Sequence, residues 1–224
     1  MTCALEVTVT AEVVSFRNPL YGGVQVGLPC PPPATIAGML AAAAGGWQQL
    51  SPDLRFGAAF TAGGAGIDLE TYHPLDGRGR KTSPTPKDRD FLARAVLTVW
   101  LVEDLDYWEK TLRRPVWPLR LGRSQDLAAA RTRRVELAAS AGRQGCAVTP
   151  VALSRAGTLL RLPTAVSLDR SRTRWDSYRY ATAGSDQLIE TGLSTPVGEE
   201  GMSGQAVALI GGVHPAQFGA EVQR

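Results

Sequence analysis

The sequence has few residues of the types that bind metals or form disulfides. Its 224 residues include two histidines and three cysteines, Cys3, Cys30 and Cys146, which lie far apart. There is no Cys-x-x-Cys motif, which argues against a structural zinc site, and we expect no metal and no cofactor. An odd number of scattered cysteines is typical of a protein from a reducing cytoplasm.

Membrane and secretion signals are also missing. The first ten residues, MTCALEVTVT, lack the basic start and the long apolar core of a signal peptide. The longest stretch without charge, between Arg17 and Asp53, is interrupted by prolines and glycines and does not fit a membrane span. We therefore expect a cytoplasmic protein that does not contact a membrane.

Motifs for two common classes of enzyme are absent. No GxxxxGK[ST] loop occurs, no GxGxxG follows a predicted strand, and residues 201–204, GMSG, do not form a GxSxG elbow. The acidic residues at 103–109 could belong to a metal-dependent nuclease. We favour the simpler interpretation that they cap a helix and stabilise its first turn.

Lysine is scarce, and the basic residues are unevenly distributed. Three of the 24 basic residues are lysines and 21 are arginines. Residues 110–180 contain 15 basic and four acidic side chains, a net charge of +11, whereas the segment on either side has a net charge of −4. Such a block is a candidate surface for a polyanion such as nucleic acid. A GC-rich genome would explain the choice of arginine, but it explains the clustering less well.

The hydrophobic pattern predicts a mixed α+β fold. Alternation of apolar and polar residues predicts a strand over 5–16, and Thr35 as an N-cap with Gly45–Gly46 as a stop predicts a short helix. We expect Gly38, inside this helix, to pack closely against a sheet. Further predictions are strands over 55–62, 67–73, 93–102 and 116–121, a turn at 63–66 and a helix over 104–114.

We interpret this series, in which three strands are predicted between the helices, as the β-α-β-β-α-β order typical of the ferredoxin-like fold, which RNA-recognition modules share. We assign residues 1–122 to this unit and residues 123–224 to an additional β-rich part packed on it. Strands are expected there over 133–139, 148–153, 158–162 and 205–210.

Several basic segments are candidates for RNA binding. A polar insertion of 17 residues, 74–90, has no periodicity and is longer than an ordinary hairpin loop. Arginine binds phosphate with two hydrogen bonds and stacks on bases, and neighbouring aromatic rings add stacking surfaces. The candidates are Arg78, Arg80, Lys81 and Lys87 in the insertion, Arg120 and Arg123 around Gly122, and Arg170, Arg172, Arg174, Trp175, Tyr178 and Arg179.

Catalytic RNA cleavage is an alternative. Acid–base cleavage of RNA needs no metal, and Tyr72 and His73 at the root of the insertion could supply a base and an acid. No lysine or second histidine lies close in sequence, so we favour a structural role for His73 at the end of a strand.

Three segments together resemble a known family. They are FRNPLYGGVQVGLPCPPPATIAGMLAAAAG at 16–45, FLARAVLTVWL at 91–101 and RPVWPLRLGRSQDLA at 114–128. Their order and spacing are similar to those of the fifth CRISPR-associated protein family, in the RAMP superfamily. The Pro-rich entry to a helix of small residues is the most specific part, and the GRS-type loop is second.

The resemblance implies a non-catalytic subunit of a type I Cascade complex for antiviral defence. Such a subunit binds the 5′ handle of the crRNA with a ferredoxin-like palm and an inserted β-hairpin thumb. It caps the filament of backbone subunits beside the large subunit and meets target DNA through the complex. On this chain the thumb would be about 74–90, the loop with Arg120, Arg123 and Ser124 would face the handle, and Arg17 and Tyr21 would lie near RNA.

In one subtype the family member itself cleaves the precursor RNA, using a tyrosine and an adjacent Lys-His pair. This chain has no Lys-His pair. We therefore expect no catalytic residues and no enzymatic activity. An endoribonuclease that processes the precursor, or a generic RNA-binding module outside CRISPR, are the alternatives.

Overall fold

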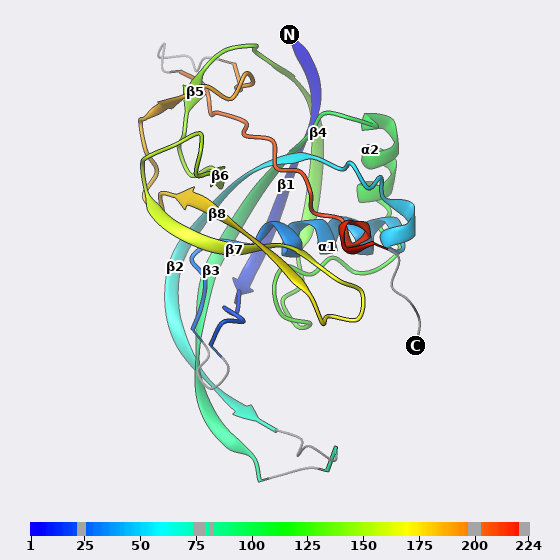
Figure 1. Cartoon of the computed structure of the whole chain (residues 1–224), viewed down its shortest axis with the longest axis vertical. Helices are drawn as coiled ribbons and strands as arrows, with labels where there is room; N and C mark the ends of the chain where they lie inside the picture. Colours follow the sequence, from blue (N-terminus) through cyan, green and yellow to red (C-terminus); the bar gives the residue numbers. More distant parts are fainter. Residues whose placement is uncertain (22–25, 74–78, 81–82, 197–202, 220–224) are drawn as a thin grey trace.

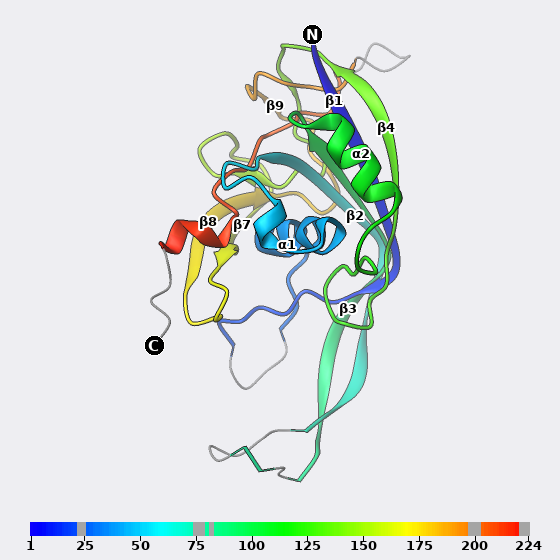
Figure 2. The same cartoon turned by 90° about the vertical axis from the view of Figure 1, so that its right-hand side faces the viewer.

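The computed structural model describes residues 1–21, 26–73, 79–80, 83–196 and 203–219. Its main element is a four-stranded antiparallel sheet in the order β2-β3-β1-β4. Two helices lie against one face of this sheet (Figure 2). The bounds are β1 Thr2–Val14, β2 Phe56–Tyr72, β3 Thr85–Leu101, β4 Ala129–Leu137, α1 Pro33–Ala44 and α2 Leu105–Arg113.

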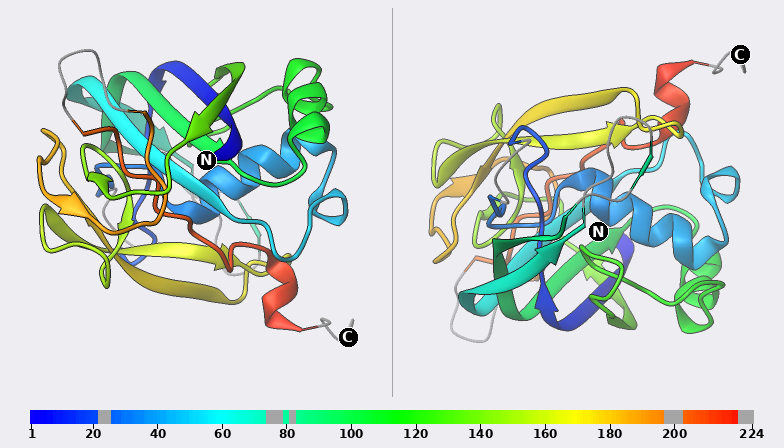
Figure 3. Two further views of the ribbon diagram at one scale, coloured as in Figure 1. Left: turned by 90° about the horizontal axis from the view of Figure 1, so that it is seen from above. Right: turned by 90° about the horizontal axis from the view of Figure 1, so that it is seen from below.

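A second, three-stranded sheet has the order β6-β8-β7. It covers α1 on the side away from the first sheet, so α1 lies between two sheets (Figure 3). The remaining elements are η1 Trp47–Gln49, β5 Gly142–Arg143, β6 Thr149–Pro150, β7 Thr158–Val166, β8 Thr173–Tyr180, β9 Leu188–Ile189 and η2 Pro215–Phe218. Antiparallel sheets with two α-helices confirm the predicted α+β class. No described helix is long and apolar enough to cross a membrane.

The sequence of α1 suits its position between the sheets. It contains no charged residue, and apolar side chains on several of its faces are buried, as expected of a helix enclosed on both sides. Gly45 ends the helix in the left-handed conformation with φ 98°, which confirms the predicted stop. The predicted N-cap at Thr35 is wrong, because the helix begins at Pro33 and Pro32 occupies the cap position.

The glycines at 63–66 do not form the predicted turn, because β2 continues through them to Tyr72. Two of these glycines lie under side chains of β3. A Cβ at Gly63 would lie 2.7 Å from Arg94 Nε, and a Cβ at Gly66 would lie 2.7 Å from the Phe91 ring. These residues therefore let side chains of β3 lie across the backbone of β2.

β3 begins at Thr85, so residues 85–90 of the predicted insertion are strand and pair with β2. The pairing of β1 with β3 stops at Leu92, beyond which β2 and β3 continue as a two-stranded ribbon. This ribbon extends away from the body of the protein (Figure 1).

The predicted strand over 116–121 is wrong. Val116 N–H and Trp117 N–H donate to the carbonyls of Ala43 and Ala42, so the segment satisfies the end of α1 instead of joining the sheet. The fourth strand of the sheet is β4, which lies beyond the boundary predicted after residue 122.

The predictions for residues 123–224 were confirmed in part. β4 and β7 overlap the strands expected over 133–139 and 158–162. The prediction over 148–153 reduces to β6, residues 205–210 form only isolated bridges, and β8 was not predicted.

One buried hydrogen bond joins the two sheets. Tyr180 of β8 is buried, and its hydroxyl donates to the Phe60 carbonyl of β2 at 2.9 Å. We expect Tyr180→Phe to lower the free energy of unfolding by about 1–2 kcal/mol, because the carbonyl loses this donor in the interior. Urea denaturation measures the change. Tyr107→Phe is the control, since the Tyr107 hydroxyl bonds the Gln49 carbonyl at an exposed site. Equal effects of the two substitutions would contradict the prediction.

Candidate nucleic-acid interface

The loop around Gly122, residues 120–127, is held in one conformation by its backbone. We call it the Gly122 loop. Gly122 has φ 109°, and a Cβ at this residue would lie 2.7 Å from the Ser15 carbonyl oxygen. Leu121 N–H donates to the Asp126 carbonyl at 3.0 Å, which closes the loop. Only glycine meets both requirements at position 122, the left-handed backbone and the close approach.

The carboxylate of Asp126 organises this loop from inside. It is buried, and its Oδ2 accepts hydrogen bonds from Ser15 N–H at 3.0 Å and Arg123 N–H at 2.9 Å. Its Oδ1 accepts from Arg123 Nε at 3.0 Å. Of the predicted RNA ligands, Arg123 is thus folded back into its own loop, whereas Arg120 and Ser124 are exposed.

Ser15 connects the Gly122 loop to the ribbon. Its hydroxyl donates to the Asp90 carbonyl on β3 at 2.7 Å, while Asp90 Oδ2 accepts from Gly27 N–H at 3.0 Å. The end of β1 with the loop that follows it, the root of the ribbon and the Gly122 loop therefore meet at one junction. We call it the Ser15 junction.

Two further candidates lie on the chain that leaves the Ser15 junction. Arg17 follows Ser15 by two residues, is exposed and bridges to Gly27. Tyr21 is half exposed. The structure thus brings Arg17 close to the same junction as the loop that carries Arg120.

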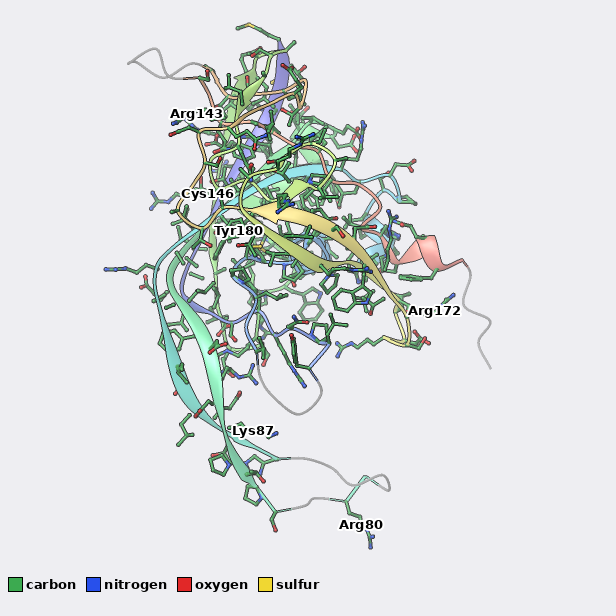
Figure 4. The ribbon with its side chains drawn as sticks, turned by 60° about the vertical axis from the view of Figure 1, so that its left-hand side comes forward. Arg80, Lys87, Arg143, Cys146, Arg172 and Tyr180 are labelled. Carbon is green, nitrogen blue, oxygen red and sulfur yellow. The ribbon has the colours of Figure 1, made fainter. Side chains whose placement is uncertain are left out.

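The paired strands of the ribbon carry a net negative charge. Arg80 and Lys87 lie along it, far from the body of the protein (Figure 4); Arg78 and Lys81 lie outside the described residues. On the paired strands Arg89 makes an ion pair with Glu70, and the carboxylates outnumber the cations. The carboxylates are Asp68, Glu70, Asp88 and Asp90, and the cations are Lys87 and Arg89.

The candidates at 170–179 lie on the β7–β8 hairpin, where Tyr178 cannot act as a stacking platform. Its ring is buried in the core and its hydroxyl bonds Thr164 Oγ1 at 2.8 Å. Burial raises the pKa of Tyr178 to about 12. With no exposed face, this ring offers nothing on which a base could stack.

Three of the candidate arginines on this hairpin bond to protein groups. Arg172 donates to the Phe218 carbonyl at 2.9 Å and lies over the Phe218 ring, and Arg174 pairs with Asp176 at 2.9 Å. Arg179 donates to the Gly157 carbonyl, Trp175 is half-buried, and Arg170 is exposed in the turn. Arg172 lies well apart from Arg80 and Lys87 (Figure 4). The structure does not unite this cluster with the ribbon.

The two residues of the catalytic alternative lie at the end of β2. His73 is exposed just beyond the end of β2, and the side chain of Tyr72 lies outside the described residues. Within the described part of the chain, no cluster of three or more His, Cys, Asp or Glu side chains could hold a metal ion.

Sequence reasoning missed Trp117, whose side chain is 60% exposed. Such exposure is unusual for a large ring and marks it as a candidate contact residue. The signal was its position between Pro115 and Pro118, in a stretch where a strand was predicted instead.

Comparison with known families identifies the chain. The model of the family described as "CRISPR-associated protein (Cas_Cas5)" matches residues 4–187. The protein belongs to the Cas5 family. This confirms the family indicated by the three sequence segments. A comparison with curated protein sequences finds no match.

Solved structures share the fold of this Cas5 protein at low sequence identity. A chain of a "CRISPR RNA-guided surveillance complex" has a TM-score of 0.56 and 18% identity, covering 92% of this chain and 95% of that one. A chain in the "Type III-B Cmr-beta bound to cognate target RNA and AMPPnP" has a TM-score of 0.55 and 11% identity, covering 83% of this chain and 86% of that one. A "CRISPR protein from Archaeoglobus fulgidus" has a TM-score of 0.51 and 15% identity, covering 90% of this chain and 99% of that one.

Removing the Asp126 carboxylate should release the Gly122 loop. We expect Asp126→Ala to lower the free energy of unfolding by about 3 kcal/mol, because Arg123 and two backbone N–H groups lose a buried acceptor. Urea denaturation measures this change. Asp186→Ala, which removes the exposed partner of Arg143, should leave the midpoint unchanged. A midpoint for Asp126→Ala equal to that of the control would show that the carboxylate does not hold the loop.

Proposed function

We propose that this Cas5 protein is a non-catalytic subunit of a type I Cascade surveillance complex that binds the 5′ handle of the crRNA. In this role it caps the filament of backbone subunits and contacts the large subunit. Target DNA meets the protein through the complex, where base pairing with the guide reads the sequence. The observation that carries the proposal is the Gly122 loop, a fixed turn that presents Arg120 and Ser124 to solvent at the Ser15 junction.

The proposed architecture is a ferredoxin-like palm with a thumb. Support comes from the strand order β2-β3-β1-β4 with both helices on one face, which is the arrangement of a split βαβ fold. The thumb would be the ribbon of β2 and β3 beyond Leu92, and would include the strand residues 85–90. The β6-β8-β7 sheet would form the added C-terminal part.

A path for the handle follows from these placements. Arg17 and Tyr21 lie on the chain that leaves the Ser15 junction, and Arg120 and Ser124 lie on the Gly122 loop beside it. Guanidinium and hydroxyl groups are common ligands of phosphate oxygens. We propose that the handle crosses this junction, with the basic residues of the thumb as a second contact.

The proposal includes no catalytic step. The Lys-His pair that the cleaving relatives use is absent from the sequence, and His73 is exposed at the end of a strand. A separate nuclease would then process the precursor RNA.

The handle interaction should depend on salt and on Arg120. A single-stranded RNA of the handle sequence should bind the full chain less tightly as salt rises, with about −0.7 in the log–log slope for each phosphate neutralised. Arg120→Ala should weaken binding about tenfold and make the slope about 0.7 shallower. Arg155→Ala is the matched control, because Arg155 is an exposed arginine in the chain between β6 and β7.

Fluorescence anisotropy over a salt series measures both effects. Affinity for the handle that does not change with salt would overturn the proposed function.

The same protein tests the absence of catalysis. Incubated alone with repeat RNA in EDTA, it should leave the RNA intact. Specific cleavage products that disappear with His73→Ala would show that the protein is an endoribonuclease instead.

A further inference from the structure

A groove of about 540 Å³ lies between α1 and the segment that leads into the Gly122 loop. We call it the Trp117 groove. Thr35, Gly38 and Met39 form its helix side, and Trp117, Pro118 and Arg120 form the opposite side. Its volume is sufficient for a nucleobase with its ribose, so the fold leaves room for a ligand beside the proposed handle contacts.

Gly38 lies at the groove and faces open space. No atom from another part of the described chain lies within 4 Å of the position that a Cβ at Gly38 would occupy. We expected close packing at this glycine, and that expectation is wrong. Glycine weakens a helix, and no close neighbour explains its presence here. Space for a ligand would explain it.

Trp117 presents a large aromatic side chain on a fixed backbone. The backbone N–H of Trp117 donates to the Ala42 carbonyl at 3.3 Å, and the backbone N–H of Val116 donates to the Ala43 carbonyl at 2.9 Å. Prolines at 115 and 118 restrict the chain on both sides. The side chain remains 60% exposed, and an exposed ring on a restrained backbone loses little freedom when a flat ligand stacks on it.

The charge around the groove selects for an anion. The chain from Lys110 to Gln125 contains five basic residues and no acidic one, and α1 has no charged residue. Of the two carboxylates that flank this stretch, Asp126 is buried and bonded to Arg123, and Glu109 makes an ion pair with Arg134. Arg120 is exposed at the side of the groove, where its guanidinium can meet a phosphate.

We propose that the Trp117 groove binds one unpaired nucleobase of an RNA strand, stacked on Trp117, with the adjoining phosphate at Arg120. This inference rests on the proposed function and specifies how the RNA is held. The groove offers the ring of Trp117 and the guanidinium of Arg120 around a space of nucleotide size. A nucleotide fits this pair better than a protein side chain does, because its base stacks on the ring and its phosphate pairs with the guanidinium.

Two substitutions test the groove by different routes. Trp117→Ala should weaken binding of a single-stranded RNA of the handle sequence about tenfold, and Trp117→Phe should restore most of the loss. Gly38→Leu should weaken binding as strongly by filling the groove, without lowering the urea midpoint, because leucine favours a helix more than glycine does. The matched control is Gly64→Leu, at an open glycine on β2.

Oligonucleotides with a single abasic site identify the occupant. The unsubstituted protein should lose affinity when one particular base is missing, and Gly38→Leu should show no further loss at that position. If the protein binds the RNA and Arg120→Ala weakens it, but Trp117→Ala and Gly38→Leu bind normally, the groove is not a base site and the proposed function stands. A protein that does not bind the RNA at all overturns the proposed function itself. Loss of assembly with other subunits at unchanged RNA affinity would show that the groove takes a protein and would overturn the inference.

Discussion

The hydrogen bonds from Ser15 and Arg123 to the buried Asp126 carboxylate fix the geometry of the proposed RNA surface. They hold the Gly122 loop against the end of β1, where Gly122 lies too close to the Ser15 backbone for any side chain. The Ser15 hydroxyl donates to the Asp90 carbonyl and so also joins the end of β1 to β3. Hydrogen bonds therefore join the loop, the root of the ribbon and the end of β1, and they place the exposed Arg17 and Arg120 on neighbouring segments.

Several arginines of the positive block found in the sequence are bonded to protein groups. Arg123 and Arg179 satisfy protein acceptors, and Arg174 is paired with Asp176. Arginines of this kind act as structural bonds, and only those with free guanidinium faces can meet phosphate. The ribbon, which lies outside the block, has more carboxylates than cations on its described strands. Counting charges along the chain therefore overestimated the number of arginines that are free to meet phosphate.

The sequence predicted the elements that local pattern controls. The alternation in β1, the stop of α1 at Gly45 and the class of the fold follow from residues close together in the chain. The family, with Arg120 and Ser124 on an exposed loop, followed from three segments with a recognisable order.

The rest depended on contacts between distant residues. Gly63 and Gly66 indicated a turn, but they lie within β2 with Arg94 and Phe91 of β3 across them. The segment at 116–121 has the composition of a strand, but its backbone N–H groups at 116 and 117 donate to carbonyls at the end of α1. Tyr178 alternates with arginines in the sequence, and the alternation of β8 turns its ring into the core.

Crosslinking of RNA to the protein tests the central claim most directly. A single-stranded RNA of the handle sequence with photoreactive uridines at successive positions would be irradiated with the full chain, and crosslinked peptides would be mapped by mass spectrometry. The account predicts crosslinks within residues 15–28, which leave the Ser15 junction, and within residues 114–127, which contain Trp117 and the Gly122 loop. Crosslinks confined to the β7–β8 hairpin, with none at the junction, would contradict it.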